Sequence, residues 1–288
     1  MHREALLRTV VLAATTVALS AFAVLAITGV EVLDQMEDSF GTDRAEDGLL
    51  MSLRVDNAYA GGYQSAFNLA VVARTSIDPT QPEPNDETTY MLMYFRGGDD
   101  EGSIFLIHTP EDTAVDSRLW LFLPALGLTK ELVSGDDQEG SFAGSTVSYG
   151  DIAGAKEMRD NYDARILRED TYGVGGEMRD VWVLELTPKA GIDPEYGRAV
   201  LWVDKEEFLM LRLEGYSSSG ALESELDVTV LGSFEGNAVQ SEIVGVDHAT
   251  GDRSTISLFD LRRPDVELPL DTFDAGRLAS FDLTVYGF

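Results

Sequence analysis

The residue types that carry out most enzyme chemistry are scarce in this sequence. It contains no cysteine, which excludes disulfides, thiolate nucleophiles and Cys-ligated metals. Its three histidines, His2, His108 and His248, stand far apart, and no His-x-x-x-His or Glu-x-x-His spacing would place two ligands on one helix face. The sequence therefore predicts no zinc site.

Motifs for nucleophiles and for phosphate binding are missing as well. There is no Gly-x-Ser-x-Gly elbow and no Gly-Lys-Ser/Thr, and Gly173-Val-Gly-Gly176 lacks the spacing of a dinucleotide-binding loop. Spacing alone does not exclude a Ser-His-Asp triad. Calcium at Asp136-Asp137-Gln138-Glu139 stays open, although no Asp-x-Asp-x-Asp-Gly loop supports it. We therefore expect a non-enzymatic protein with no cofactor and no metal.

The charge of the chain restricts its partners. The formal net charge is -30, with only four lysines, so nucleic acid and anionic membrane surfaces are repelled at long range. An acidic, lysine-poor surface is typical of a protein that stays hydrated in a salty medium. An acidic periplasmic protein without such adaptation explains the composition nearly as well.

The amino terminus has the pattern of a secretory signal. Arg3 and Arg8 precede an uncharged run from Thr9 to Val30 that is rich in Ala, Val and Leu. Small residues allow cleavage after Ala23 or Ala26. We predict a signal peptide over residues 1–26 and one domain over 31–288. The alternative is an uncleaved membrane anchor to about residue 30, because an apolar run of about 18 or more residues can span a bilayer.

After the signal, the chain predicts one short helix and then many strands. Val32, Met36 and Phe40 recur every four residues, which indicates a helix over 31–40. Turn-forming sequences separate the later apolar runs and predict consecutive antiparallel hairpins. The predicted strands are 49–55, 66–74, 88–96, 103–108, 118–123, 128–133, 164–168, 180–187, 198–203, 209–216, 223–231, 238–246 and 254–261.

Two of these strands are apolar on both faces, namely 90–95 and 119–123. An antiparallel sheet with one face in water would alternate apolar and polar residues instead. Something must therefore cover both faces there, either a helix in the concavity of a curved sheet or a bound ligand. The number of regular strands favours a barrel or a strongly curved sheet.

The segment 118–152 carries two motifs in series. A Trp-x-Phe-x-Pro-Ala-Leu stretch is followed some fifteen residues later by Ser-Phe-x-Gly-Ser and then by an aromatic residue before an acidic one. This pair resembles the outer-membrane lipoprotein-sorting (LolA-like) family of periplasmic proteins. The matching residues are Trp120, Phe122, Pro124, Ala125, Leu126, Ser141, Phe142, Gly144, Ser145, Tyr149, Asp151 and Ile152.

The segment departs from the family pattern at three positions. Phe122 replaces the usual tyrosine, Ala143 the usual methionine, and Gly150 the usual acidic residue at the start of a short helix. Only Lys130 remains of the basic run that usually follows the first motif, so the role of a basic partner surface is in doubt here. Elsewhere, 196–205 resembles a family strand, and the similarity covers roughly 31–278.

The resemblance implies a mainly β fold, an antiparallel unclosed (half) β-barrel with a few helices over its concave face. Family members carry lipoprotein acyl chains across the periplasm, and others are thought to serve lipid exporters of the resistance-nodulation-division type. We therefore expect a monomeric periplasmic carrier whose partners are lipoprotein acyl chains or lipids and an inner-membrane transporter. The ligand-binding candidates are Trp120, Phe122, Leu123, Leu126, Phe142, Trp182 and Trp202.

A second function fits the same residues. The fold could recognise a lipid and contact a transporter without shuttling, and an intact amino-terminal anchor would favour this lipid-sensing module because a shuttle must diffuse. For any one aromatic residue, an ordinary core position is the simpler interpretation. An exported hydrolase is the third alternative, and no nucleophile–base pair supports it.

Overall fold

The protein forms one antiparallel sheet of thirteen strands that does not close. The computed structural model describes residues 27–39, 45–77, 87–98, 100–110, 115, 117–133, 142, 145–146, 157–192 and 195–288. The sheet order is β6-β5-β4-β3-β2-β1-β13-β12-β11-β10-β9-β8-β7, so β1 pairs with β13 and every other contact joins consecutive strands. This confirms the predicted mainly β, unclosed fold.

The strands are β1 (Leu49–Ala58), β2 (Gln64–Ile77), β3 (Glu87–Arg96), β4 (Ile104–Pro110), β5 (Arg118–Leu123), β6 (Leu128–Glu131), β7 (Tyr162–Val174), β8 (Glu177–Pro188), β9 (Arg198–Asp204), β10 (Met210–Tyr216), β11 (Leu222–Phe234), β12 (Asn237–Asp247) and β13 (Arg253–Arg262). Among the described residues, the helices are α1 (Gly29–Ser39), α4 (Glu157–Asn161) and three 3-10 helices, η3 (Leu270–Phe273), η4 (Ala275–Ser280) and η5 (Leu283–Tyr286).

All thirteen predicted strands are present, and the largest error concerns β7. We predicted a strand over 164–168, whereas β7 runs from Tyr162 to Val174. A β-bulge between Ile166 and Arg168 interrupts the alternation of its side chains, and the residues that follow are charged and exposed. Both features belong to an edge strand, where apolar periodicity is weak.

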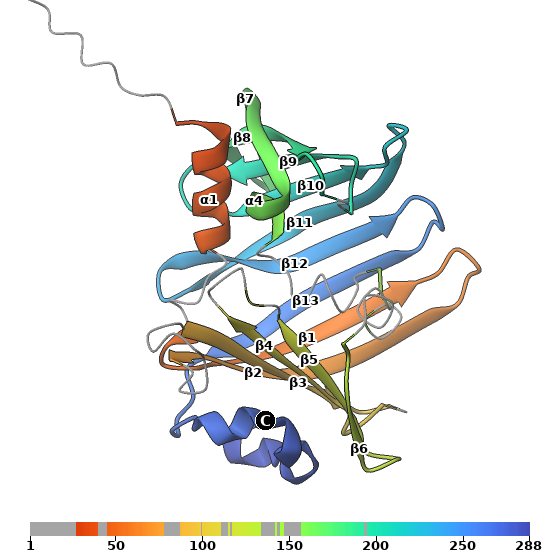
Figure 1. The fold of residues 1–288 in the computed structure, drawn as a ribbon, viewed down its shortest axis with the longest axis vertical. Coiled ribbons are helices and arrows are strands. Elements are labelled where there is room, and N and C mark those ends of the chain that lie inside the picture. The colour runs from red at the N-terminus through yellow and green to blue at the C-terminus, as the bar shows by residue number, and fades with distance from the viewer. Residues whose placement is uncertain are drawn as a thin grey trace, which may run out of the picture.

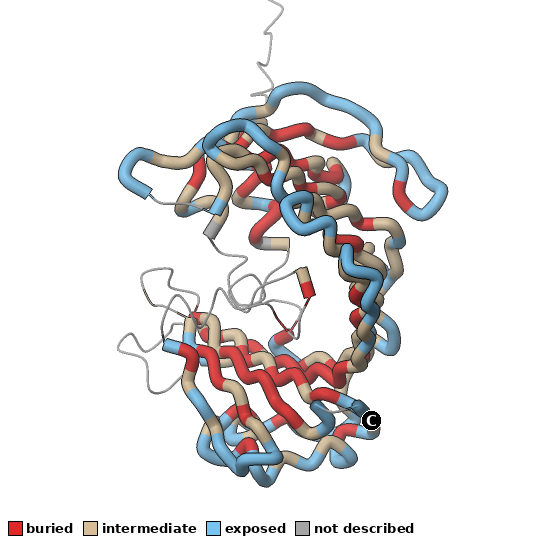
Figure 2. Tube along the Cα trace, turned by 90° about the vertical axis from the view of Figure 1, so that its right-hand side faces the viewer, coloured by how far each residue is buried: buried red, intermediate tan, exposed pale blue. Residues whose placement is uncertain are grey.

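Figures 1 and 2 show the sheet bent into an open C, with β6 and β7 at its two edges. The carboxyl-terminal helices lie on the outside of the C, against the strands at the lower end of the view. The inner side of the C is therefore the sheet face opposite to these helices. Among the described residues, no helix is long and apolar enough to cross a membrane, and most of the predicted signal lies outside them.

Helix α1 begins at a capping box. The Thr28 hydroxyl accepts a hydrogen bond from the Glu31 amide (3.2 Å), and the Glu31 carboxylate accepts one from the Thr28 amide (2.7 Å). These hydrogen bonds lower the pKa of Glu31 below its ordinary value. The predicted apolar stripe is confirmed for Val32 and Met36, which are buried; Phe40 lies outside the described residues.

Helix α1 also approaches the edge of the sheet very closely. A Cβ added at Gly29 would lie 2.7 Å from the Ala164 carbonyl oxygen of β7, so no other residue fits there without movement. The helix thus covers an edge strand that would otherwise offer free backbone groups to another chain.

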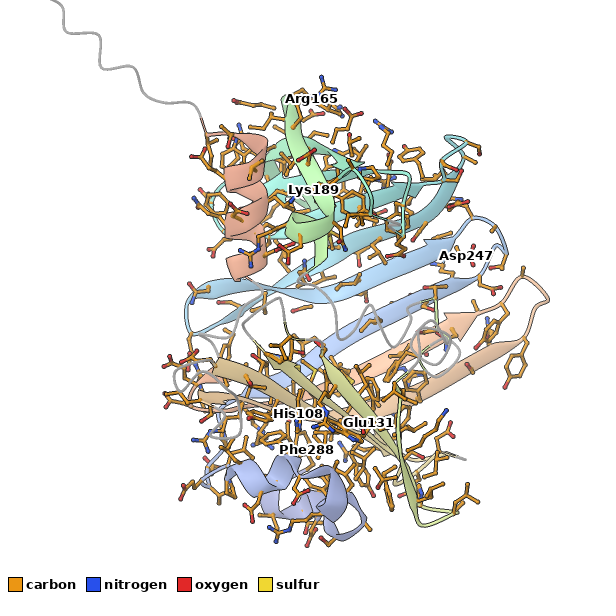
Figure 3. All side chains as sticks on the ribbon, in the orientation of Figure 1. His108, Glu131, Arg165, Lys189, Asp247 and Phe288 are labelled. Carbon is orange, nitrogen blue, oxygen red and sulfur yellow. The ribbon has the colours of Figure 1, made fainter. Side chains whose placement is uncertain are left out.

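The three 3-10 helices cover the outer face of β1 to β5, and the sequence did not predict them. Phe273 and Tyr286 are buried in one cluster with Leu92, Leu106 and Trp120. Figure 3 shows His108 and Phe288 at this end of the molecule. The His108 Nε2 atom lies 2.8 Å from the Phe273 carbonyl oxygen, which can only accept, so the imidazole anchors η3 to β4.

Candidate ligand-binding face

Helix α1 and Phe142 cover opposite ends of the same sheet face. At one end, Phe142 packs in a cluster with Phe95 and Phe105, against which Met51 and Leu53 of β1 also pack. At the other end, α1 packs on β8, β9 and β10 in a second cluster. Strand pairing connects the two ends, because directly paired residues share a face.

The pairing that connects the two ends runs through β1, β13, β12 and β11. Val55 pairs with Ile256 and Ile256 with Ile243, which brings the face of Met51 and Leu53 across β13 to β12. Two residues further along β12, Gly245 pairs with Leu226, and Leu226 packs against the α1 cluster. Since the carboxyl-terminal helices cover the opposite face, this is the concave face of the sheet (Figure 2).

Between the two covered ends, the concave face carries a row of half-buried aliphatic side chains. All five are half-buried, and three of them, Leu53, Leu226 and Ile243, also pack against buried clusters at their edges. An apolar row of this kind, flanked by covered clusters, is what a hydrocarbon ligand would fill. We call it the central strip; its residues are Leu53, Leu226, Ile243, Ile256 and Leu258.

A polar seam crosses the face at one side of the central strip. The Thr146 amide donates to the Ser254 hydroxyl (2.9 Å), and that hydroxyl donates to Asn57 Oδ1 (2.8 Å). The Asn57 side-chain amide in turn donates to Ser65 (3.2 Å). Ser254 is 1% exposed, so these bonds satisfy groups that would otherwise be buried without partners.

A glycine makes room for this seam. A Cβ added at Gly245 would lie 2.7 Å from the Thr146 hydroxyl oxygen, so Thr146 sits directly on the backbone of β12. Ser145 is buried, and its amide donates to the Phe142 carbonyl (2.9 Å). The Ser-Phe-x-Gly-Ser motif thus has a structural role: Phe142 fills an aromatic pocket, and the turn after it docks Thr146 on the concave face.

Phe142 owes its position to three other rings. Its ring centroid lies 5.6 Å from that of Phe105, 5.7 Å from Phe95 and 6.1 Å from Phe67. These separations are in the range where aromatic pairs add favourable contacts beyond burial. Of the predicted ligand-binding residues that the structure describes, Phe142 therefore has the most aromatic contacts on the concave face.

A buried carboxylate lies at the α1 end of the face. Glu37 is 8% exposed, and it accepts from the Arg159 amide of α4 (2.8 Å) and pairs with the Arg159 guanidinium (3.0 Å). Burial raises the pKa of Glu37 to about 7, and the bonds to Arg159 oppose this shift. Asp34 and Asp160 add negative charge nearby, while the Lys189 ammonium donates to the Arg159 carbonyl (2.7 Å).

The structure does not bring the seven predicted ligand-binding residues together. Trp120 and Phe122 lie on the outer face, buried in the cluster under the carboxyl-terminal helices. They alternate with Leu119, which packs with Phe142 on the concave face. The reason is the period of two in a strand: Trp120 and Phe122 share one face of β5 and cannot also reach the other.

The other predicted residues are scattered. Trp182 packs near α1 with its ring 5.3 Å from that of Phe208, whereas Trp202 belongs to another cluster and holds the Arg212 guanidinium 5.5 Å from its ring. Leu123 is partly exposed at the end of β5. Leu126 is 70% exposed in the turn between β5 and β6.

The Pro-Ala-Leu stretch forms that turn. The Leu126 amide donates to the Leu123 carbonyl (3.1 Å) and the Gly127 amide to the Pro124 carbonyl (3.2 Å), while Gly127 adopts a φ of 58°. Pro124 and Ala125 therefore shape a hairpin and do not line the concave face. Five further motif residues lie outside the described residues, namely Ser141, Gly144, Tyr149, Asp151 and Ile152.

The two strands with apolar residues on both faces are explained by the chain itself. Tyr90 and Leu92 of β3 lie under the carboxyl-terminal helices, and Met93 and Phe95 lie in the Phe142 cluster. The prediction that both faces must be covered is correct, yet the cover is not a ligand. The open apolar surface lies instead on β1, β11, β12 and β13.

Sequence reasoning missed the central strip. The signal that could have found it is the alternation in β13, where Ile256 and Leu258 point one way and Ser257 the other. This pattern identifies a face, but only the pairing of β1 with β13 shows that the strip lies midway between two covered clusters. Among the described residues, no three His, Asp or Glu side chains gather into a group that could hold a metal ion.

Comparison with known proteins identifies the family of the chain and its fold. A protein-family model described as "uncharacterized protein" matches residues 87–280, which is well over half of the chain. The chain belongs to that family. No curated protein is similar enough in sequence to count as a match.

Solved structures extend the comparison to the fold. A DUF1329 family protein from Desulfovibrio piger has a TM-score of 0.71 at 24% identity, covering 87% of this chain and 97% of that one. A putative outer membrane lipoprotein-sorting protein domain from Vibrio parahaemolyticus gives 0.69 at 23% identity over 87% and 98%. A LolA superfamily protein from Nitrosomonas europaea gives 0.58 at 19% over 86% and 98%. The chain therefore has the LolA-like fold.

Proposed function

We propose that the protein is a periplasmic carrier that holds acyl chains of lipoproteins or lipids against its concave face. The observation that carries this proposal is the central strip, five half-buried aliphatic side chains between two covered clusters. The water-accessible part of an apolar row inside a curved sheet is costly unless a ligand covers it. An acyl chain supplies matching surface without polar groups that would need partners.

The energy of transfer sets a minimum length for the ligand. Burying one CH2 group contributes about 0.8 kcal/mol, so ten methylenes contribute about 8 kcal/mol. Association itself costs at least about 4 kcal/mol. Chains of well over ten carbons, or more than one chain, are therefore needed for stable binding. Each two added methylenes should strengthen binding by roughly tenfold or slightly more.

Three further observations support the carrier over an enzyme. The LolA-like fold is shared with the putative outer membrane lipoprotein-sorting protein domain from Vibrio parahaemolyticus. The amino-terminal sequence has the pattern of a secretory signal, which favours the periplasm. The sequence also lacks motifs for nucleophilic or metal-assisted catalysis. We further propose that the cargo passes to or from an inner-membrane transporter of the resistance-nodulation-division type, in outer-membrane lipoprotein sorting or lipid export, and that the carrier is a monomer.

The direct test is binding of a fluorescent long-chain fatty acid to matched variants. Ile256→Glu places a carboxylate in the central strip, whereas Thr255→Glu places the same group one residue away on the opposite sheet face. We expect micromolar binding to the wild type, at least tenfold weaker binding to Ile256→Glu, and unchanged binding to Thr255→Glu. Because neither position is fully buried, both variants should fold, and thermal unfolding checks this.

Two results would count against the proposal. One is no binding by the wild type across a series of chain lengths. The other is equal binding by the two glutamate variants, which would place the probe elsewhere.

Mass spectrometry of lipid that co-purifies with the protein would identify the cargo. Amino-terminal sequencing of the mature protein separates a diffusing carrier from an anchored lipid-sensing module.

A further inference from the structure

The outer face carries a pocket that the acyl-chain proposal does not use. It has a volume of about 310 Å³ and is lined by Ser52, Asn68, Leu69, Arg96 and Phe259. These residues come from β1, β2, β3 and β13. Ser52 and Phe259 are paired neighbours, as are Asn68 and Arg96, so the lining consists of two adjacent rungs of the sheet. At roughly 30 Å³ per water, the pocket has room for about ten water molecules or one small organic molecule.

A β-bulge shapes one wall of this pocket. The pairing of β1 with β13 shifts between Leu50 and Ser52, next to Phe259, which is 47% exposed. The following residue, Asp260, has a φ of 57°, a left-handed conformation that is unusual for a residue with a side chain. Bulges redirect side chains, and strained backbone of this kind is maintained by its surroundings. Here the bulge presents an aromatic ring at the pocket rim.

Arg96 gives the pocket a positive charge that no carboxylate among the described residues pairs with. Most arginines that the structure describes pair with a carboxylate, among them Arg54 with Asp56 (2.7 Å) and Arg262 with Asp260 (3.4 Å) beside the pocket. Within the described part of the chain, Arg96 has no carboxylate within 4 Å, and its nearest recorded partner is the Phe288 ring at 6.0 Å. In a chain of net charge -30, a surplus arginine is a notable exception.

The other polar groups of the pocket are also available. Ser52 is 4% exposed, and neither its hydroxyl nor the Asn68 amide makes a side-chain hydrogen bond within the described residues. A guanidinium offers five donors in a planar fork that matches a carboxylate, and a hydroxyl and an amide can complete the set. The Phe259 ring forms the apolar side. The Leu69 side chain points to the opposite face, where it packs with Phe142, so Leu69 lines the pocket with its backbone alone.

We infer that this pocket binds a small organic carboxylate whose flat apolar part lies against the Phe259 ring. The carboxylate pairs with the Arg96 guanidinium and receives hydrogen bonds from Asn68 and Ser52. The site lies on the face opposite to the central strip, so it is separate from acyl-chain binding. Figure 3 shows Phe288 at the same lower end of the molecule, and its ring lies between the Arg96 and Arg262 guanidinium groups at 6.0 and 5.2 Å.

Benzoate, benzamide and inorganic phosphate serve as probes in a titration followed by two-dimensional NMR. We expect benzoate to shift the Asn68 side-chain amide and the backbone amides of Ser52 and Phe259. Benzamide has the same shape without the charge, and phosphate has the charge without the ring, so both should bind at least about tenfold more weakly. Arg96→Gln should weaken the binding of benzoate by tenfold or more.

Arg253→Gln is the matched control, because Arg253 also lacks an ion pair among the described residues but does not line the pocket. Its benzoate affinity should equal that of the wild type. Ser52→Val removes a donor and fills space without changing the charge, and it should also weaken binding. The inference is overturned if benzoate causes no shifts in the pocket, if the two arginine variants lose affinity equally, or if phosphate or benzamide binds as well as benzoate.

Discussion

Strands β4 and β13 belong to one sheet, yet the chain covers them very differently. Five of the seven residues of β4 are buried, whereas one of the ten residues of β13 is. Strand β4 lies between the carboxyl-terminal helices on one face and Phe142 on the other. Strand β13 has hydrophobic residues on the concave face, but no described helix lies over them. The contrast indicates that the described part of the chain packs the ends of the sheet more densely than its middle, where we propose that a ligand binds.

The largest expected effect tests this contrast with two truncations. Phe105 is fully buried beside Phe142, so Phe105→Ala should lower the free energy of unfolding by about 3–5 kcal/mol. Ile256 in the central strip is only partly buried, so Ile256→Ala should cost only about 1 kcal/mol. Urea denaturation of the ligand-free protein measures both. Equal losses would show that the middle of the sheet is as well packed as its end.

The α1 end of the sheet should respond to pH through Glu37. Its pKa is raised to about 7 in the folded protein from an ordinary 4.5, so the folded state keeps a proton that the unfolded state releases between these values. Stability from this group is present at low pH and is lost as pH rises through 7, by up to about 3 kcal/mol. Glu37→Gln stays neutral, so its stability relative to the wild type should increase between pH 4.5 and pH 7.

Glu31 on the same helix is the control for this experiment. Its pKa is lowered by the hydrogen bonds to Thr28, so its contribution is present above the ordinary value and is lost as pH falls. Glu31→Gln should therefore destabilise the protein at neutral pH, the opposite of Glu37→Gln. Denaturant midpoints at pH 5 and pH 8 decide both signs. A pH-independent difference between Glu37→Gln and the wild type would show that the burial of Glu37 is not coupled to its protonation.

The seam beside the central strip should give an intermediate effect. Gly245→Ala forces a methyl group to 2.7 Å from the Thr146 hydroxyl oxygen, so Thr146 must move away from Ser254. We expect a loss of about 1–3 kcal/mol in the free energy of unfolding. Gly61→Ala is the control, because nothing lies within 4 Å of its added Cβ and its φ is not left-handed. Equal stability of the two variants would mean that Thr146 does not dock on β12.

The smallest effect on stability is expected for an exposed ion pair on β1. Arg54 and Asp56 lie two residues apart on β1 at 2.7 Å, and each is nearly half exposed. Such pairs contribute about 0–1 kcal/mol, and salt screens them. Arg54→Ala should therefore change the stability by less than about 1 kcal/mol in dilute buffer and by still less in 1 M salt. A larger loss that persists in salt would mean that Arg54 acts through packing.

The sequence predicted the strands because each has an apolar core and is bounded by turn residues. It also predicted α1 from the stripe of Val32 and Met36. It could not assign faces, since the period of two in β5 says that Trp120 and Leu119 point apart but not which of them points inward. The 3-10 helices were missed because 263–288 has no long helical periodicity and is ordered by burial of Phe273 and Tyr286 against the sheet.

The predicted ligand-binding residues and the central strip lie at different places in the sheet. Aromatic residues drew the prediction to β5, β8 and β9, where they are core or outer-face residues. The central strip consists of ordinary aliphatic residues from β1, β11, β12 and β13, and only long-range strand pairing brings them together. No local pattern in the sequence reports such pairing between β1 and β13, which are about two hundred residues apart in the chain.

The most direct test of the central claim uses isoleucine methyl groups as reporters. With the δ1 methyls labelled, a spin-labelled stearate should broaden the NMR signals of Ile243 and Ile256, which lie in the central strip. The signal of Ile104, buried on the outer face under the carboxyl-terminal helices, should stay sharp. Broadening of Ile104 in place of Ile243 and Ile256, or no selective broadening at all, would contradict an acyl-chain site on the concave face.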